Sequence, residues 1–197
     1  MLAELGLEPQ PKATIIGYVG NGVRRLVERT VRVAGGSSDG PLVGDALGIF
    51  LARYGAHLLD TTVAYPGIAA VVTRLREAGV ELSVATNKPE AMALEILTGL
   101  GLAEAFAAVL GGDSLQTHKP DPAIVHTLVQ RAGVPRGQTL LVGDSPVDVA
   151  TARAAGVAVC AVTWGLTPAA VLLAEGPDFA VSRPQELLEL RPVAARH

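Results

Sequence analysis

Two aspartates spaced four residues apart, Asp144 and Asp148, form the part of this chain best suited to metal chemistry. An apolar run over residues 139–142 leads into Gly143-Asp144, and a helical pattern begins at Pro146. One carboxylate therefore lies at the tip of a predicted strand and the other on the first turn of a predicted helix. Mg²⁺ takes one or two protein carboxylates and fills its other positions with water and phosphate oxygens. The pair predicts a Mg²⁺ site beside a phosphate, although helix capping and the helix dipole would account for both acids without a metal.

Two further polar segments follow predicted strands. Thr86 and Asn87 come directly after the run 80–85, where a hydroxyl and successive backbone N–H groups at a helix start make an anion site. The alternative is that Thr86 only caps that helix. Lys119 precedes a helix predicted over residues 122–132, which is the unfavourable end of the dipole for a cation. An anion facing Lys119 explains this placement, and a solvated surface lysine is the alternative.

Alternating apolar and amphipathic segments from residue 65 onward predict an α/β domain. Strands are expected over residues 80–85, 106–110, 139–142, 157–162 and 178–181. Helices are expected over residues 66–79, 89–100, 122–132, 146–155 and 184–190. This order is typical of a parallel sheet covered by helices on both faces. Ligands of such sheets bind outside the carboxyl ends of the strands, so the polar residues described above are expected to converge there.

The first 60 residues show helical periodicity and no convincing strand. Helices are expected over residues 22–33 and 41–59, and residues 3–5 have the pattern of the end of another helix. We interpret residues 1–62 as a helical cap domain and residues 63–197 as the α/β core domain.

Composition places the chain among globular proteins and excludes several classes of partner. Apolar residues make up 49% and charged residues 18%, and the mean hydropathy of +0.38 supports a well-buried core. A net charge of −3 without clustered Lys and Arg argues against nucleic acid. No apolar run reaches the length of a membrane span, and no signal peptide is visible. The single cysteine, Cys160, lies in an apolar run, which favours an inert core thiol and a reducing, cytoplasmic location.

The order of three motifs resembles that of the haloacid dehalogenase-like (HAD) hydrolases. Residues 85–89 (Ala-Thr-Asn-Lys-Pro), Lys119-Pro120 and residues 143–148 (Gly-Asp-Ser-Pro-Val-Asp) are similar to motifs two, three and four of that family. Within the family the chain is most similar to bacterial phosphoglycolate phosphatases, whose cap segment and return from cap to core resemble residues 17–22 and 65–67. The resemblance covers essentially the whole chain, and it implies a Rossmann-like parallel core with an N-terminal helical cap.

The resemblance also implies a role for each polar residue. Thr86 and the backbone amide of Asn87 would hold phosphate oxygens. Lys119 would neutralise the phosphate and the nucleophile, so that Thr86 and Lys119 count as catalytic. Asp144 would ligate Mg²⁺, and Asp148 would ligate it or orient its waters. In the family these groups stabilise phosphoryl charge electrostatically.

The reaction implied is Mg²⁺-dependent hydrolysis of a small phosphorylated acid, with 2-phosphoglycolate as the expected substrate. Asn21, between two glycines at a helix start, and Arg24 nearby are predicted to bind the carboxylate of the substrate. Another capped HAD phosphatase or mutase acting on sugar phosphates is an alternative, and a catalytically inactive protein that binds phosphate and Mg²⁺ is a second. The chain is expected to be a monomer or a homodimer, with a small phosphorylated metabolite as its partner and no nucleic acid or membrane.

One motif of the family has no counterpart in this sequence. HAD hydrolases begin with a strand ending in Asp-x-Asp-Gly-Thr, whose first Asp is the nucleophile and whose second Asp is the general acid and base. No Asp-x-Asp occurs in these 197 residues, so we expect the central strand of the sheet to be missing and turnover by the chain to be negligible. A misplaced start codon or a truncated chain would explain this, and the reading frame upstream of Met1 is expected to encode the motif.

Overall fold

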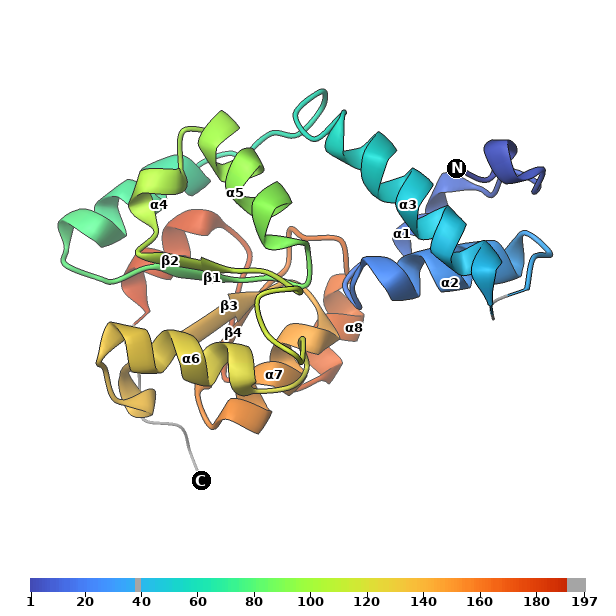
Figure 1. Ribbon diagram of the computed structural model, residues 1–197. Coiled ribbons are helices and arrows are strands. Elements are labelled where there is room, and N and C mark those ends of the chain that lie inside the picture. Colours follow the sequence, from blue (N-terminus) through green and yellow to red (C-terminus); the bar gives the residue numbers. More distant parts are fainter. Residues whose placement is uncertain (38–39, 191–197) are drawn as a thin grey trace. The chain divides into compact units, whose positions relative to one another are not determined.

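The chain divides into two compact units, Met1–Thr62 and Val63–His197, in a computed structural model that describes residues 1–37 and 40–190. Figure 1 labels the helices and strands of both units. The two units differ in class, since the first is helical where it is described and the second combines helices with parallel strands. Each unit is described by itself below.

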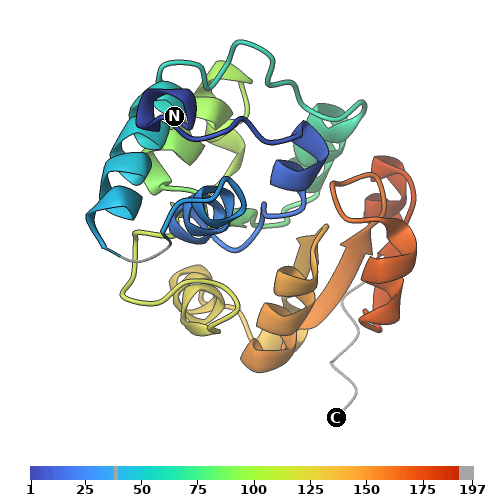
Figure 2. The ribbon, with the colours of Figure 1, turned by 90° about the vertical axis from the view of Figure 1, so that its right-hand side faces the viewer.

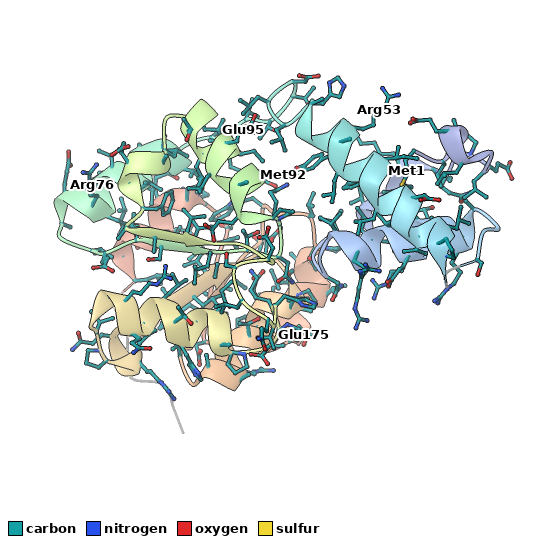
Figure 3. All side chains as sticks on the ribbon, in the orientation of Figure 1. Met1, Arg53, Arg76, Met92, Glu95 and Glu175 are labelled. Atoms are coloured by element: carbon teal, nitrogen blue, oxygen red, sulfur yellow. The ribbon has the colours of Figure 1, made fainter. Side chains whose placement is uncertain are left out.

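The first unit holds the short 3₁₀ helix η1 (Ala3–Leu5) and the helices α1 (Lys12–Ile16), α2 (Val23–Val33) and α3 (Pro41–Gly55). Gly22, with φ at +85°, precedes α2, and Pro41 occupies the first turn of α3, where its missing N–H costs nothing. The buried faces of α2 and α3 form the core of the unit, which consists of Val27, Val31, Val43 and Ala46. Arg53 of α3, labelled in Figure 3, pairs with the carboxylate of Glu4 in η1 at 3.4 Å, which links the first and last helices of the unit among the described residues.

Over residues 63–190 the second unit contains five strands, and every paired strand runs parallel to its neighbour. They are β1 (Ser83–Ala85), β2 (Ala108–Leu110), β3 (Leu140–Gly143), β4 (Ala158–Val162) and β5 (Phe179–Val181). Strand β1 pairs with β2, and β4 lies between β3 and β5. All five residues of β4 are buried, as expected for a middle strand that is covered on both faces. The prediction of an α/β fold with a parallel sheet is confirmed.

Helices cover both faces of these strands. They are α4 (Ile68–Glu77), α5 (Glu90–Gly99), α6 (Ala123–Ala132), α7 (Pro146–Ala155) and α8 (Ala169–Ala174), with 3₁₀ turns η2 (Ala103–Ala105), η3 (Arg136–Gln138) and η4 (Pro184–Glu189). Figure 1 and Figure 2 show α5, in green, above the pair β1-β2 and α6, in yellow, below it. The largest buried cluster packs α6 and α7 against β4 and includes Ile124, Val149, Val159 and Leu172.

Helix α7 has the strongest local signals of the chain, and they fix where it begins. The Ser145 side chain accepts a hydrogen bond from the Asp148 backbone N–H, while the Asp148 side chain accepts one from the Ser145 backbone N–H. This capping box satisfies two N–H groups that would otherwise lack partners. Pro146 follows in the first turn, and Gly156 ends the helix with φ at +67°. The sequence therefore positions Asp148 on the first turn of α7 by local rules.

The strands are assigned to two sheets, β1-β2 and β3-β4-β5. Within the described residues no ladder joins β1 to β3, and Val142 of β3 is 44% exposed although it is apolar. The absence of a central strand, expected from the resemblance, stays a prediction.

Several element boundaries differ from the sequence-based predictions. The helix expected over residues 41–59 ends at Gly55. The apolar pattern continues past this point because Leu58, in the turn that follows, is also buried. The first two strands are three residues long instead of six and five. The C-terminal helix is a 3₁₀ helix, η4, and residue 190 lies beyond it. Helices α1 and α8 were not predicted, because five and six residues are too short for a periodic pattern.

No helix in the described part of the chain is both long and apolar enough to cross a membrane.

Cys160 is expected to resist thiol reagents in the folded protein. The residue is 0% exposed in β4, and burial raises the pKa of its thiol to about 12, with the charge of Glu186 as a smaller contribution. The reactive thiolate is therefore scarce at pH 8. Labelling with a chromogenic disulfide should detect no thiol in native protein and one thiol per chain in urea. Rapid labelling of the native protein would contradict this burial.

Candidate functional site

The polar residues expected to converge follow the strands of the second unit. Thr86 comes directly after β1, Lys119 lies between β2 and α6, and Asp144 comes directly after β3. Asp148 lies on the first turn of α7. Since parallel strands point their carboxyl ends to the same edge, loops and helix starts from distant parts of the sequence meet there.

The side chain of Lys119 joins two of these segments. Its ammonium group donates to the backbone oxygen of Ala85 at 2.8 Å and to Oδ1 of Asp148 at 2.7 Å. The Lys119 and Asp148 side chains are 11% and 9% exposed, so this is a nearly buried ion pair. The alternative of a solvated surface lysine is wrong. The ion pair links the end of β1 to the start of α7.

Asn87 holds the backbone of Lys119 in place. Its Nδ2 donates to the backbone oxygen of Lys119 at 2.9 Å, and its Oδ1 accepts from the backbone N–H of Lys119 at 2.9 Å. Asn87 is 9% exposed, and its backbone oxygen would lie 2.6 Å from any Cβ added at Gly112. Only the backbone amide of Asn87 was predicted to bind phosphate, because the contact made by its side chain has no signal in the sequence beyond the polarity of the residue.

Thr86 forms a tight turn at the end of β1. Its backbone N–H donates to the oxygen of Leu110 at 3.0 Å, and its hydroxyl oxygen accepts from the N–H of Lys88 at 3.1 Å. Helix α5 begins only at Glu90 with Pro89 at its N-cap, so the alternative that Thr86 caps this helix is wrong. Among residues 1–37 and 40–190 no acceptor is identified for the hydroxyl hydrogen, which could therefore donate to a phosphate oxygen.

Both carboxylate oxygens of Asp148 accept hydrogen bonds. Oδ1 accepts from Lys119, and Oδ2 accepts from the backbone N–H and the hydroxyl of Ser145 at 3.1 and 2.6 Å. A Cβ at Gly143 would lie 2.3 Å from the Cβ of Asp148, so the carboxylate rests directly against the end of β3. This geometry makes Asp148 the partner of the Lys119 cation and part of a helix cap, which leaves a metal-ligating role for it as a prediction.

Asp144 is placed differently. Its Oδ2 accepts a hydrogen bond from the backbone N–H of Leu166 at 2.9 Å. Among residues 1–37 and 40–190 no other hydrogen bond to the Asp144 side chain is identified. Oδ1 is the oxygen that remains to bind a cation. No group of three or more His, Cys, Asp or Glu suited to a metal occurs in the described residues. The donors nevertheless fit Mg²⁺, because this ion needs only one or two carboxylates when water and phosphate oxygens complete its octahedron.

The remaining predicted site residues, Asn21 and Arg24, lie in the first unit. Asn21 precedes Gly22, which caps α2, and Arg24 lies in the first turn of that helix. The Arg24 guanidinium is 3.8 Å from the carboxylate of Glu28 and its side chain is 66% exposed. Their role in binding a carboxylate stays a prediction.

Comparison with known proteins relates this arrangement to a family. A family model described as haloacid dehalogenase-like hydrolase matches residues 1–162. The phosphoglycolate phosphatase of Rhodospirillum rubrum is 42% identical over 187 residues, which span 91% of this chain and 78% of that protein. The phosphoglycolate phosphatase of Pseudomonas putida is 38% identical over 192 residues, which span 95% of this chain and 70% of that protein. The crystal structure of a predicted phosphoglycolate phosphatase from Haemophilus somnus has a TM-score of 0.86 and 29% identity, covering 95% of this chain and 85% of that one. The chain therefore belongs to the haloacid dehalogenase-like hydrolases.

Proposed function

We propose that this chain carries the phosphate- and Mg²⁺-binding site of a phosphatase that acts on a small phosphorylated acid, with 2-phosphoglycolate as the substrate. The observation that carries the proposal is the nearly buried Lys119 ammonium group, which lies between the end of β1 and the start of α7. An ammonium group has three donors, and Ala85 and Asp148 accept from two of them, so one donor would serve an anion. Membership of the family and the names of the relatives from Rhodospirillum rubrum and Pseudomonas putida support a phosphate ester as that anion.

Three residues would contact the phosphoryl group or its cation. The Lys119 ammonium group would offset the negative charge of the phosphoryl oxygens, and the Thr86 hydroxyl would donate to one of them. Oδ1 of Asp144 would ligate Mg²⁺, since its Oδ2 is held by Leu166. Mg²⁺, when bound, would neutralise phosphoryl charge as a Lewis acid. Asn87 would hold the backbone of Lys119 in position, and Asp148 would hold its ammonium group.

The roles above do not include a nucleophile to attack the phosphoryl group. The 197 residues contain no Asp-x-Asp. Of the two acids of the site, Asp148 is paired with Lys119, and Asp144 would ligate Mg²⁺ under this proposal. We therefore propose that the polypeptide of this sequence binds phosphate and Mg²⁺ with negligible turnover. The same observation favours the second candidate, a protein that binds phosphate and Mg²⁺ without catalysis.

Inorganic phosphate with Mg²⁺ is expected to stabilise the protein. A ligand at 100 times its dissociation constant adds about 2.7 kcal/mol to the free energy of unfolding, which a thermal-shift measurement detects readily. Lys119→Met should abolish the phosphate effect, and Asp144→Asn should abolish the part that depends on Mg²⁺. Release of phosphate from 2-phosphoglycolate should stay at the background rate.

Arg131→Met is the matched control for the loss of a cation, because Arg131 is exposed in the last turn of α6. It should leave phosphate binding unchanged. Equal loss of binding in the Lys119 and Arg131 variants would contradict the site, and substantial release of phosphate from 2-phosphoglycolate would contradict the absence of a nucleophile.

A further inference from the structure

We infer that Gly165 is a positioning residue for the cation site: its lack of a side chain lets the loop after β4 approach Asp144 and direct one carboxylate oxygen to the metal. The inference rests on the proposed function, in which Asp144 ligates Mg²⁺. A Cβ added at Gly165 would lie 2.2 Å from both the Cβ and Oδ2 of Asp144 and 2.5 Å from its Cγ. Real Cβ atoms essentially never come within 3.0 Å of another heavy atom, so no side chain fits at position 165.

The close approach brings a hydrogen-bond donor to the carboxylate. The N–H of Leu166, the next residue, donates to Oδ2 of Asp144 at 2.9 Å. A carboxylate held by one oxygen presents the other in a fixed direction, which is what an ion with strict octahedral geometry requires. Gly165 and Leu166 therefore determine that Oδ1 is the oxygen offered to a cation.

Backbone conformation does not explain why residue 165 is a glycine. Gly165 is absent from the described glycines whose φ is positive, so alanine would meet no backbone strain at this position. The three heavy atoms nearest to the added Cβ all belong to Asp144. Since the Cβ of Asp144 is fixed by its own backbone, rotation of the carboxylate would not relieve that contact. Either β3 or the loop at residues 163–166 would have to move.

The test compares Gly165→Ala with Gly44→Ala. Gly44 lies in α3, and a Cβ there would meet nothing within 4 Å. The Mg²⁺ dissociation constant is measured by calorimetry, and phosphate affinity is measured separately without Mg²⁺. We expect Gly165→Ala to weaken Mg²⁺ binding by about 10- to 100-fold, the range for residues that orient a metal ligand. Phosphate affinity without Mg²⁺ should stay within about twofold, because Lys119 and Thr86 are untouched, and Gly44→Ala should change neither value.

The outcomes separate this inference from the proposed function. Normal Mg²⁺ binding by the unaltered protein and by Gly165→Ala would overturn the inference alone. Failure of the unaltered protein to bind Mg²⁺ would overturn the metal site of the proposed function and this role of Gly165 with it.

A stability cycle keeps the inference testable if Gly165→Ala fails to fold. Asp144→Gly removes the Cβ that alanine would contact, so the double variant Asp144→Gly/Gly165→Ala should regain the folded state. Recovery of folded protein supports the contact between residues 144 and 165. A double variant that stays unfolded, while Asp144→Gly alone folds, would overturn it.

Discussion

Lys119→Met is expected to lower the free energy of unfolding by about 3–5 kcal/mol, the cost of removing one partner from a buried ion pair. The Asp148 side chain is only 9% exposed, and its carboxylate would lose the ammonium group that now lies 2.7 Å from Oδ1. The backbone N–H and hydroxyl of Ser145 would still donate to Oδ2, so the carboxylate would stay in place with two of its three donors. Urea unfolding at pH 7, followed by circular dichroism, measures the change.

A double-mutant cycle identifies the cause of this loss. Asp148→Asn removes the charge and keeps the shape of the side chain, so the double variant Lys119→Met/Asp148→Asn should be more stable than the sum of the single variants predicts. Contacting residues couple by about 0.5–3 kcal/mol in such cycles. Arg131→Met, which removes an exposed cation, should change stability by no more than about 0.5 kcal/mol. A Lys119 variant as stable as this control would show that the buried pair is not formed.

Most of the fold and the convergence of the site segments follow from sequence rules. Apolar runs that end at Ala85 and Gly143 predict strands, and parallel strands bring their carboxyl ends together. Ser145, Pro146 and Gly156 predict the limits of α7 by local capping alone. These features are predictable because each depends on residues close together in the chain.

The pairing within the site could not be predicted, because it depends on residues far apart in the chain. The sequence indicated that Asp148 lies near a phosphate, and its contact with Lys119 joins residues 29 positions apart. Asn87 contacts Lys119 over 32 positions, and Asp144 contacts Leu166 over 22. Whether a carboxylate faces a cation of the protein or a metal is decided by where these loops meet.

Asn87→Ala is expected to have the second large effect, and it acts on Lys119 without removing it. The change deletes two hydrogen bonds of 2.9 Å and leaves the backbone N–H and oxygen of Lys119 without them. Each buried polar group left unsatisfied costs about 1–3 kcal/mol, so the loss of two partners should lower the free energy of unfolding by about 2–6 kcal/mol. Gln130→Ala, which removes an exposed amide from α6, is the control and should be close to neutral.

Phosphate affinity distinguishes positioning of Lys119 from a purely structural role of Asn87. Calorimetric titration should show weaker binding of inorganic phosphate to Asn87→Ala by about tenfold or more, the size expected when one charge-assisted hydrogen bond is misplaced. Asn87→Asp keeps an acceptor for the Lys119 N–H and should recover part of this loss. In the Lys119→Met background, Asn87→Ala should weaken binding no further, because the cation it positions is gone. An additional loss in that background would show that the Asn87 side chain contributes to phosphate binding independently of Lys119, because alanine keeps the backbone amide.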